Sequence, residues 1–220
     1  GWSLLIGSLL FVPAIFALSM TTEPSITPSI TVETAKKGGP RTMIAVLATI
    51  AMIQYLGFSA IQSFFNVYLD EGLGVSTALI GLLLACAQLT GGIGGLATPL
   101  LTKRLRHGSV VAITSIMGAV AILPIALFPA WWVAGASYLV LTGLATMRYA
   151  AITVYHQELA PQEWRTSMAG AFNMAGGLSY SLSSIAGGFA IASIGFSKMF
   201  LAGAAISVVG ALLFWMFCRS

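Results

Sequence analysis

Residues 110–128 read VVAITSIMGAVAILPIALF, a run without a single charged side chain. A helix needs about 20 mainly apolar residues to cross a hydrocarbon core of roughly 30 Å, and this run is long enough to do so. In lipid every backbone polar group has to be bonded within the segment, which for a run of this length means an α-helix. The stretch therefore predicts a membrane-spanning helix.

The same pattern recurs along the whole chain. Hydrophobic residues make up 58% of the sequence and charged residues only 7%, whereas ordinary globular proteins carry about 25% charged residues. Outer-membrane strands would be about half as long and would alternate. The sequence therefore predicts an all-α integral membrane protein. Seven spanning helices are expected, at 2–19, 43–68, 75–101, 109–128, 130–155, 166–193 and 197–217.

The basic residues predict how these helices are oriented, because Lys and Arg accumulate on the cytoplasmic side of short loops. Lys198 lies in a loop of the opposite set and Arg148 lies within the fifth helix. We therefore expect a multi-pass protein of the inner (plasma) membrane, with the N-terminal end of this chain outside and its C-terminus in the cytoplasm. The net charge of +4 reflects this bias and does not indicate nucleic-acid binding. The residues expected to be cytoplasmic are Lys36, Lys37, Arg41, Lys103, Arg104, Arg106, Arg165 and Arg219.

The longest polar stretch divides the chain into three parts. Residues 20–42 read MTTEPSITPSITVETAKKGGPRT, which is rich in Ser, Thr and Pro and ends basic. This composition is typical of a flexible linker. It separates one helix, in 1–19, from six closely connected helices in 43–220. We interpret 1–19 as the last helix of a preceding transporter half and 43–220 as a six-helix bundle.

Two of the six helices carry a polar stripe. At 100° per residue, the stripe of the 43–68 helix fills a sector of about 60° and that of the 130–155 helix about 80°. A polar stripe inside a membrane helix has to face protein or water rather than lipid. These stripes therefore predict the lining of a cavity. Their members are Tyr55, Ser59, Gln62 and Asn66 in the first helix, and Tyr138, Thr142, Thr146, Tyr149, Thr153 and His156 in the second.

The other four helices complete two triplets. Helices 109–128 and 197–217 are nearly apolar all round, which is typical of lipid-facing helices. Helices 75–101 and 166–193 instead carry small residues on one face, which lets helix backbones approach closely. The second of these faces also presents Asn173 and Tyr180. The order of stripe, small-residue face and apolar helix occurs twice, which predicts two three-helix repeats of inverted topology.

Three stretches together resemble the C-terminal half, helices six to twelve, of a major facilitator superfamily transporter. FFNVYLDEGLGVSTALIGLL (64–83) is similar to the turn between helices seven and eight of that family. GGLATPLLTKRLRHG (94–108) resembles the second copy of its cytoplasmic loop signature, with Thr98 and Pro99 where the family usually has an acidic residue. QELAPQEWRTSMAGAFNMAGGLSYSLSSIAGG (157–188) resembles its loop between helices ten and eleven.

The resemblance implies alternating access, in which two six-helix halves rock around a central site lined by helices seven and ten. The partners it implies are a small-molecule substrate, membrane lipid and an N-terminal transporter half. It also implies a cytoplasmic loop latch, formed here by Lys103, Arg104, Arg106, Glu163 and Arg165.

The candidate site combines the two stripes with two residues of the sixth helix. Arg148 lies about 120° from the fifth helix's stripe, so both a gating or structural role and contact with an anionic substrate stay open. The substrate-cavity candidates are Tyr55, Ser59, Gln62, Asn66, Tyr138, Thr142, Thr146, Tyr149, Asn173 and Tyr180.

Neutral hydrogen-bonding and aromatic groups favour a neutral or amphipathic solute. We therefore predict a secondary transporter or facilitator, with efflux of amphipathic compounds favoured over uptake of sugars or organic anions. No Asp or Glu lies in the predicted helices, so coupling resides in the other half or the protein is a facilitator. A receptor or sensor on the same fold is the alternative.

An enzyme is not expected. Ser137 and His156 lie on one helix about 28 Å apart at about 1.5 Å per residue, too far for a hydrogen bond. The chain has no motif for a metal or another cofactor. A retinal protein would need a lysine well inside its last helix, whereas the one lysine of 197–217, Lys198, lies at the start of that range.

Overall fold

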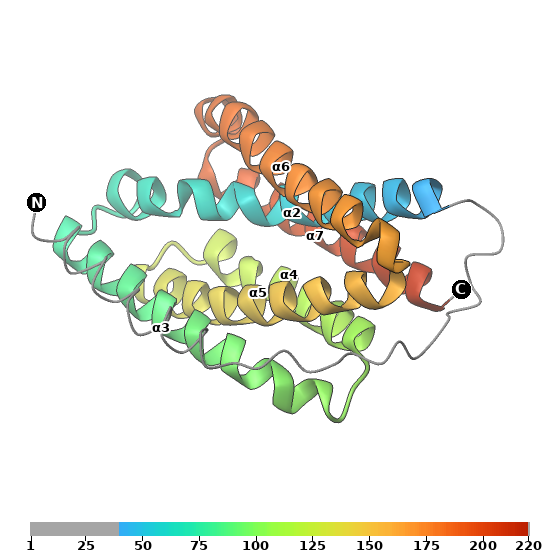
Figure 1. The fold of residues 1–220 in the computed structure, drawn as a ribbon. Helices are drawn as coiled ribbons and strands as arrows, with labels where there is room; N and C mark the ends of the chain where they lie inside the picture. The colour runs from blue at the N-terminus through green and yellow to red at the C-terminus, as the bar shows by residue number, and fades with distance from the viewer. Residues whose placement is uncertain (1–39, 220) are drawn as a thin grey trace, which may run out of the picture. The chain divides into compact units, whose positions relative to one another are not determined.

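The computed structural model describes residues 40–219, which are helical over almost their whole length and contain no strand. These residues form six long α-helices, whose arrangement is drawn in Figure 1. The prediction of an all-helical fold is confirmed for this part of the chain. The elements are α2 (Pro40–Val67), the π-helix η2 (Tyr68–Gly72), α3 (Thr77–Thr102), α4 (His107–Leu127), α5 (Trp131–Leu159), the 3-10 helix η3 (Gln162–Trp164), α6 (Arg165–Ile194) and α7 (Phe196–Arg219).

The helix bounds lie within a few residues of those expected from hydropathy. α2 begins at Pro40 rather than at residue 43. Proline suits the first turn of a helix, because its ring fixes φ and the N–H it lacks would be unbonded there anyway. α5 continues to Leu159, past the expected end at residue 155. The predicted helix 2–19 and all but the last three residues of the predicted linker lie outside the described residues.

Five of the described helices are long and apolar enough to cross a membrane, which supports a multi-pass membrane protein. They are α2 together with η2, α3, α4, α6 with η3, and α7. α5 has 29 residues and is long enough, but Arg148 and its many tyrosines and threonines make it more polar than the others. The predicted count of seven spans is therefore not confirmed.

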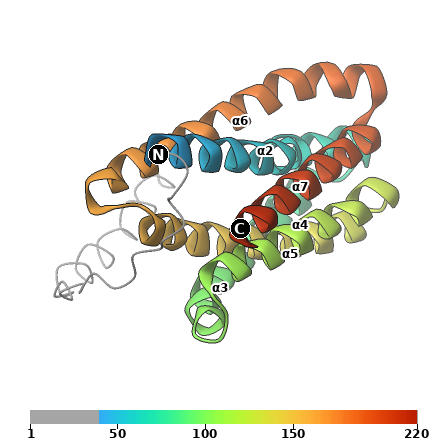
Figure 2. The ribbon, with the colours of Figure 1, turned by 90° about the vertical axis from the view of Figure 1, so that its right-hand side faces the viewer.

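Helices from the first half of the described chain (α2–α4) pack mainly on helices from the second half (α5–α7). α2 packs on α6 and α7, α5 packs on α3 and α4, and α4 packs on α7. In Figures 1 and 2, α2 and α6 lie together on one side of the bundle and α3 and α5 lie on the other. Taking α2–α4 and α5–α7 as two triplets, the first helix of each packs on the second and third helices of the other. Both triplets thus make the same set of contacts, as expected for an internal repeat.

Glycines allow the closest helix contacts. A Cβ on Gly94 of α3 would collide with the backbone oxygen of Gly143 on α5, and one on Gly57 of α2 would collide with that of Gly203 on α7. Membrane helices associate by such close backbone packing, since lipid gives no hydrophobic drive between them. Gly195, with a φ of 81°, forms the one-residue joint between α6 and α7.

Two apolar clusters fill the interior. One surrounds Phe65 and Phe200 and the other surrounds Leu47 and Phe214. Each of four helices contributes one end to the first cluster and the other end to the second. Between these two ends, each of the four helices carries buried polar residues. A polar layer therefore separates the clusters near the middle of the bundle. Its buried members are Gln54 on α2, Thr114 and Ser115 on α4, Thr142 and Arg148 on α5, and Ser207 on α7.

Candidate functional site

Arg148 occupies the centre of the polar layer and is only 8% exposed. Its Nη1 donates a hydrogen bond to Oε1 of Gln54 at 3.4 Å, and Nε2 of Gln54 donates to the backbone oxygen of Gly210 at 3.0 Å. The polar chain thus runs from α5 through α2 to α7. Arg148 reaches into the bundle instead of extending to the membrane surface.

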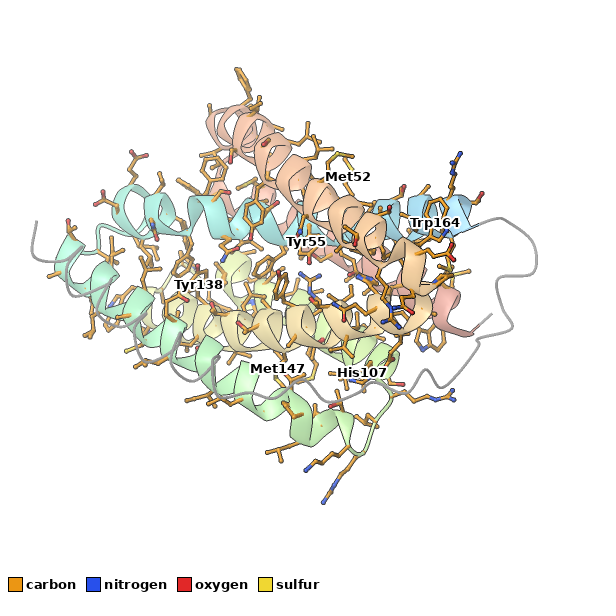
Figure 3. All side chains as sticks on the ribbon, viewed as in Figure 1. Met52, Tyr55, His107, Tyr138, Met147 and Trp164 are labelled. Carbon is orange, nitrogen blue, oxygen red and sulfur yellow. The ribbon has the colours of Figure 1, made fainter. Side chains whose placement is uncertain are left out.

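Two aromatic rings of α2 flank the guanidinium of Arg148. Its Cζ lies 5.0 Å from the ring centroid of Tyr55 and 5.6 Å from that of Phe58. A cation within about 6 Å of an aromatic ring centroid is attracted by the ring quadrupole, more strongly where water is excluded. Tyr55 extends from α2 toward α5 in Figure 3. The rings therefore hold the cation in place without cancelling its charge.

Tyrosines from three helices gather beside Arg148. Tyr55 on α2 is half-buried and lies within electrostatic range of Tyr149 on α5, which is 58% exposed. Tyr180 on α6 is 37% exposed and donates a hydrogen bond to Oε1 of Gln62 on α2. We call these four residues (Tyr55, Gln62, Tyr149 and Tyr180) the tyrosine face. It offers aromatic surfaces, hydroxyls and one amide to a solute, without a formal charge.

The rest of the α2 stripe is divided. Ser59 is fully buried, and its hydroxyl lies 2.6 Å from that of Ser183 on α6. Ser179 of α6 donates in turn to the backbone oxygen of Met52 at 2.9 Å. Ser59 therefore lies in the seam between α2 and α6. Asn66, near the end of α2, is exposed.

Most of the α5 stripe faces protein. The ring of Tyr138 stacks on that of Phe65, with centroids 3.8 Å apart and planes 5° from parallel. Thr142 donates to the backbone oxygen of Tyr138 at 2.8 Å, and Thr146 donates to that of Thr142 at 3.0 Å. These threonine hydroxyls bond their own helix, so Tyr149 is the stripe member that lies open beside Tyr55.

The remaining sequence candidates lie apart from the tyrosine face. Asn173 is exposed on the first half of α6. In the predicted latch, Lys103, Arg104, Arg106 and Glu163 are exposed and Arg165 is partly buried. Within residues 40–219 these side chains form no ion pair with one another. A pair that the sequence did not suggest joins the same end of the bundle instead, with Nδ1 of His107 3.1 Å from Oε1 of Glu158.

Sequence reasoning did not identify the partners of Arg148 or of Ser59. Gln54 adjoins the stripe residue Tyr55 but points about 100° away from it. Ser115 and Ser207 are among the few polar residues of two otherwise apolar helices, and both are buried. A solitary serine in an apolar membrane helix is a usable signal, because a hydroxyl facing lipid gains nothing there. Within the described residues, no cluster of His, Cys, Asp or Glu could hold a metal ion.

A bundle of membrane-length helices with a polar layer and an open face of hydrogen-bonding aromatics is typical of membrane transport proteins. The sequence matches the family model described as Major Facilitator Superfamily over residues 47–220. No curated protein matches the chain. The chain belongs to the Major Facilitator Superfamily, whose members are membrane transporters of small molecules rather than enzymes.

Proposed function

We propose that this chain forms the C-terminal half of an alternating-access transporter, and that the tyrosine face is its share of the solute site. The observation that carries the proposal is the hydrogen bond from Tyr180 of α6 to Gln62, which lies on the same face of α2 as Tyr55. The exposed Tyr149 of α5 lies within electrostatic range of Tyr55. Binding sites combine aromatic surface with a few placed polar groups. The solute is neutral or amphipathic, and the direction is efflux.

The surface of α6 supports a second half. On the side away from α2, α6 exposes small and polar residues that include Gly177, Ser184 and Gly188. A Cβ on Gly177 or Gly188 would meet nothing within 4 Å. A neighbouring side of the same helix exposes Ile185 and Phe189, at 65% and 76%. Large apolar side chains suit lipid and small ones suit a close helix partner.

The first helix of each triplet packs on the second and third helices of the other triplet. This arrangement supports inverted three-helix repeats, the architecture in which a substrate site lies at the repeat interface. We infer that the end of the bundle carrying Lys103, Arg104 and Arg106 faces the cytoplasm of the inner (plasma) membrane, since short cytoplasmic loops are enriched in basic residues. The three cations are exposed and are available to a carboxylate of the other half. Glu163 and Arg165 belong to the same proposed latch.

The proposal is tested by flux through proteoliposomes that hold the transporter with both halves. The probes are ethidium as an amphipathic compound, radiolabelled glucose as a sugar and radiolabelled benzoate as an organic anion. We expect saturable flux of ethidium, and Gln62→Ala to lower kcat/KM about fivefold, as expected for the loss of one hydrogen bond worth about 1 kcal/mol.

The matched control is Ser193→Ala on α6, because this exposed hydroxyl bonds only its own helix. It should leave flux unchanged. Flux that is equally insensitive to Gln62→Ala and Tyr180→Phe would place the site elsewhere. Saturable binding of a probe without any flux would instead favour a receptor or sensor.

A further inference from the structure

A small cavity lies inside the bundle beside Arg148. Its volume is about 20 Å³, and it is lined by residues of α2, α4, α5 and α7. The lining includes Gln54, Ser115, Arg148 and Ser207, and none of the four residues of the tyrosine face. We call this space the Arg148 chamber. Its lining therefore differs from that of the proposed solute site, and Arg148 lies between the two.

Two hydroxyls in the chamber have no hydrogen-bond partner within residues 40–219. They belong to Ser115 and Ser207, which are 7% and 8% exposed. Buried polar groups are normally bonded, since leaving one unpaired costs the full loss of its hydration. Thr114, the third hydroxyl at the chamber, donates to the backbone oxygen of Val110 at 2.7 Å and is therefore satisfied.

The charge of Arg148 is not neutralised by any carboxylate in the part of the chain that the structure describes. Glu158, on the same helix, is about 15 Å along the axis at about 1.5 Å per residue, and it is paired with His107. Asp70, Glu71 and Glu163 lie at helix ends. An isolated buried charge is strongly unfavourable unless a counter-charge accompanies it. The contacts seen for Arg148 are an amide oxygen and two neutral rings.

The chamber therefore presents donors around an uncompensated cation. The guanidinium has five N–H groups, of which one donates to Oε1 of Gln54. Each serine hydroxyl can also donate once. A cavity of this size has room for about one water molecule or an ion of similar size. Sulfate, phosphate and organic anions are too large for it.

We propose that the Arg148 chamber binds one small inorganic anion, of which chloride is the representative, between the guanidinium and the hydroxyls of Ser115 and Ser207. The bound anion connects α4 and α7 to α2 and α5 at the level of the polar layer. It stabilises the folded bundle whether or not a solute occupies the tyrosine face. The proposal does not depend on the identity of the transported solute.

The experiment measures the melting temperature of the purified full-length transporter in sodium chloride and in sodium gluconate at equal ionic strength. An anion that binds only the folded state raises the melting temperature, and the rise grows with the logarithm of its concentration above Kd. We expect a rise of about 2–5 °C here. The double variant Ser115→Ala with Ser207→Ala should lose this difference while still folding, since each change removes one oxygen atom. Arg148→Gln should also lose it.

Arg104→Gln and Ser193→Ala are the matched controls, because both side chains are exposed and neither lines the chamber; both should retain the chloride effect. Crystals grown in bromide should show one anomalous peak beside Arg148. A chloride effect that persists in the double serine variant would overturn the proposal. An ordered water with no bromide peak would do the same. Loss of ethidium flux in Gln62→Ala with the chloride effect intact separates this site from the solute site.

Discussion

The hydroxyl of Ser59 on α2 lies 2.6 Å from that of Ser183 on α6, and both residues are buried. Ser183 also contacts the backbone oxygen of Leu56 at 3.1 Å. With Ser179 bonded to Met52, a row of serines connects the first helix of one triplet to the second helix of the other. Tyr180 follows Ser179 directly along α6, so this seam fixes the position of Tyr180 relative to Gln62 on α2.

Removing the Ser183 hydroxyl should therefore loosen the seam. We expect Ser183→Ala to lower the free energy of unfolding by about 0.6 kcal/mol, the average measured for hydrogen bonds between membrane helices, and by no more than about 1.7 kcal/mol, the largest value. Thermal unfolding in detergent measures the change. A double-mutant cycle with Ser59→Ala isolates the pair, and a coupling energy near zero would show that the two hydroxyls do not stabilise each other.

The six described helices could be predicted from hydropathy because the loops between them are short and polar. The partners of each helix could not. A helical wheel groups Ser59 with Tyr55 and Gln62 on one stripe, yet the stripe spans two environments, one against α6 and one beside α5. Which part is covered depends on where the second triplet packs, and that information lies in residues far away in the sequence.

The same limit applies to Arg148. Its wheel angle predicted a position off the stripe, and the structure shows what it meets there: Gln54, Tyr55 and Phe58, all from α2. Ser115 and Ser207 belong to helices that the sequence describes only as apolar. They line the same cavity as Arg148 because α4 packs on α5 and α7 packs on α2 and α4, which no local pattern specifies.

Gly94 tests the close contact between α3 and α5. A Cβ at this position would collide with the backbone of Gly143, which cannot move aside as a flexible side chain could. We expect Gly94→Ala to lower the free energy of unfolding by about 1–3 kcal/mol, as overpacking does. Gly176→Ala is the control, since a Cβ there meets nothing within 4 Å. It should leave stability unchanged or raise it, because alanine favours a helix.

Tyr149 tests the accessible part of the α5 stripe. Because the side chain is 58% exposed, Tyr149→Ala should change the melting temperature little. It should raise the KM for ethidium about fivefold, which corresponds to the loss of about 1 kcal/mol of aromatic contact with the solute. Val154→Ala, an exposed position farther along α5, should alter neither quantity. An unchanged KM in Tyr149→Ala would remove this residue from the proposed site.

The pair of His107 and Glu158 should contribute little. The two side chains are 27% and 54% exposed, and solvent-exposed ion pairs contribute about 0.2–1 kcal/mol. Glu158→Gln should therefore lower the free energy of unfolding by about 0.5 kcal/mol or less. The effect should shrink further in high salt, which screens exposed charges. A loss several times larger would mean that this pair acts as a structural clamp between α4 and α5.

Gly188 tests whether the small-residue side of α6 receives a second transporter half. A Cβ at Gly188 meets nothing within 4 Å among the described residues, so Gly188→Leu should not disturb the six-helix bundle itself. In the transporter with both halves, a leucine there would push apart two closely packed helices at a cost of about 1–3 kcal/mol. We expect ethidium flux to fall about tenfold or more. Phe189→Leu changes the adjoining, lipid-sized side of α6 and should leave flux unaltered. Equal flux in both variants would mean that no helix packs against Gly188 during transport.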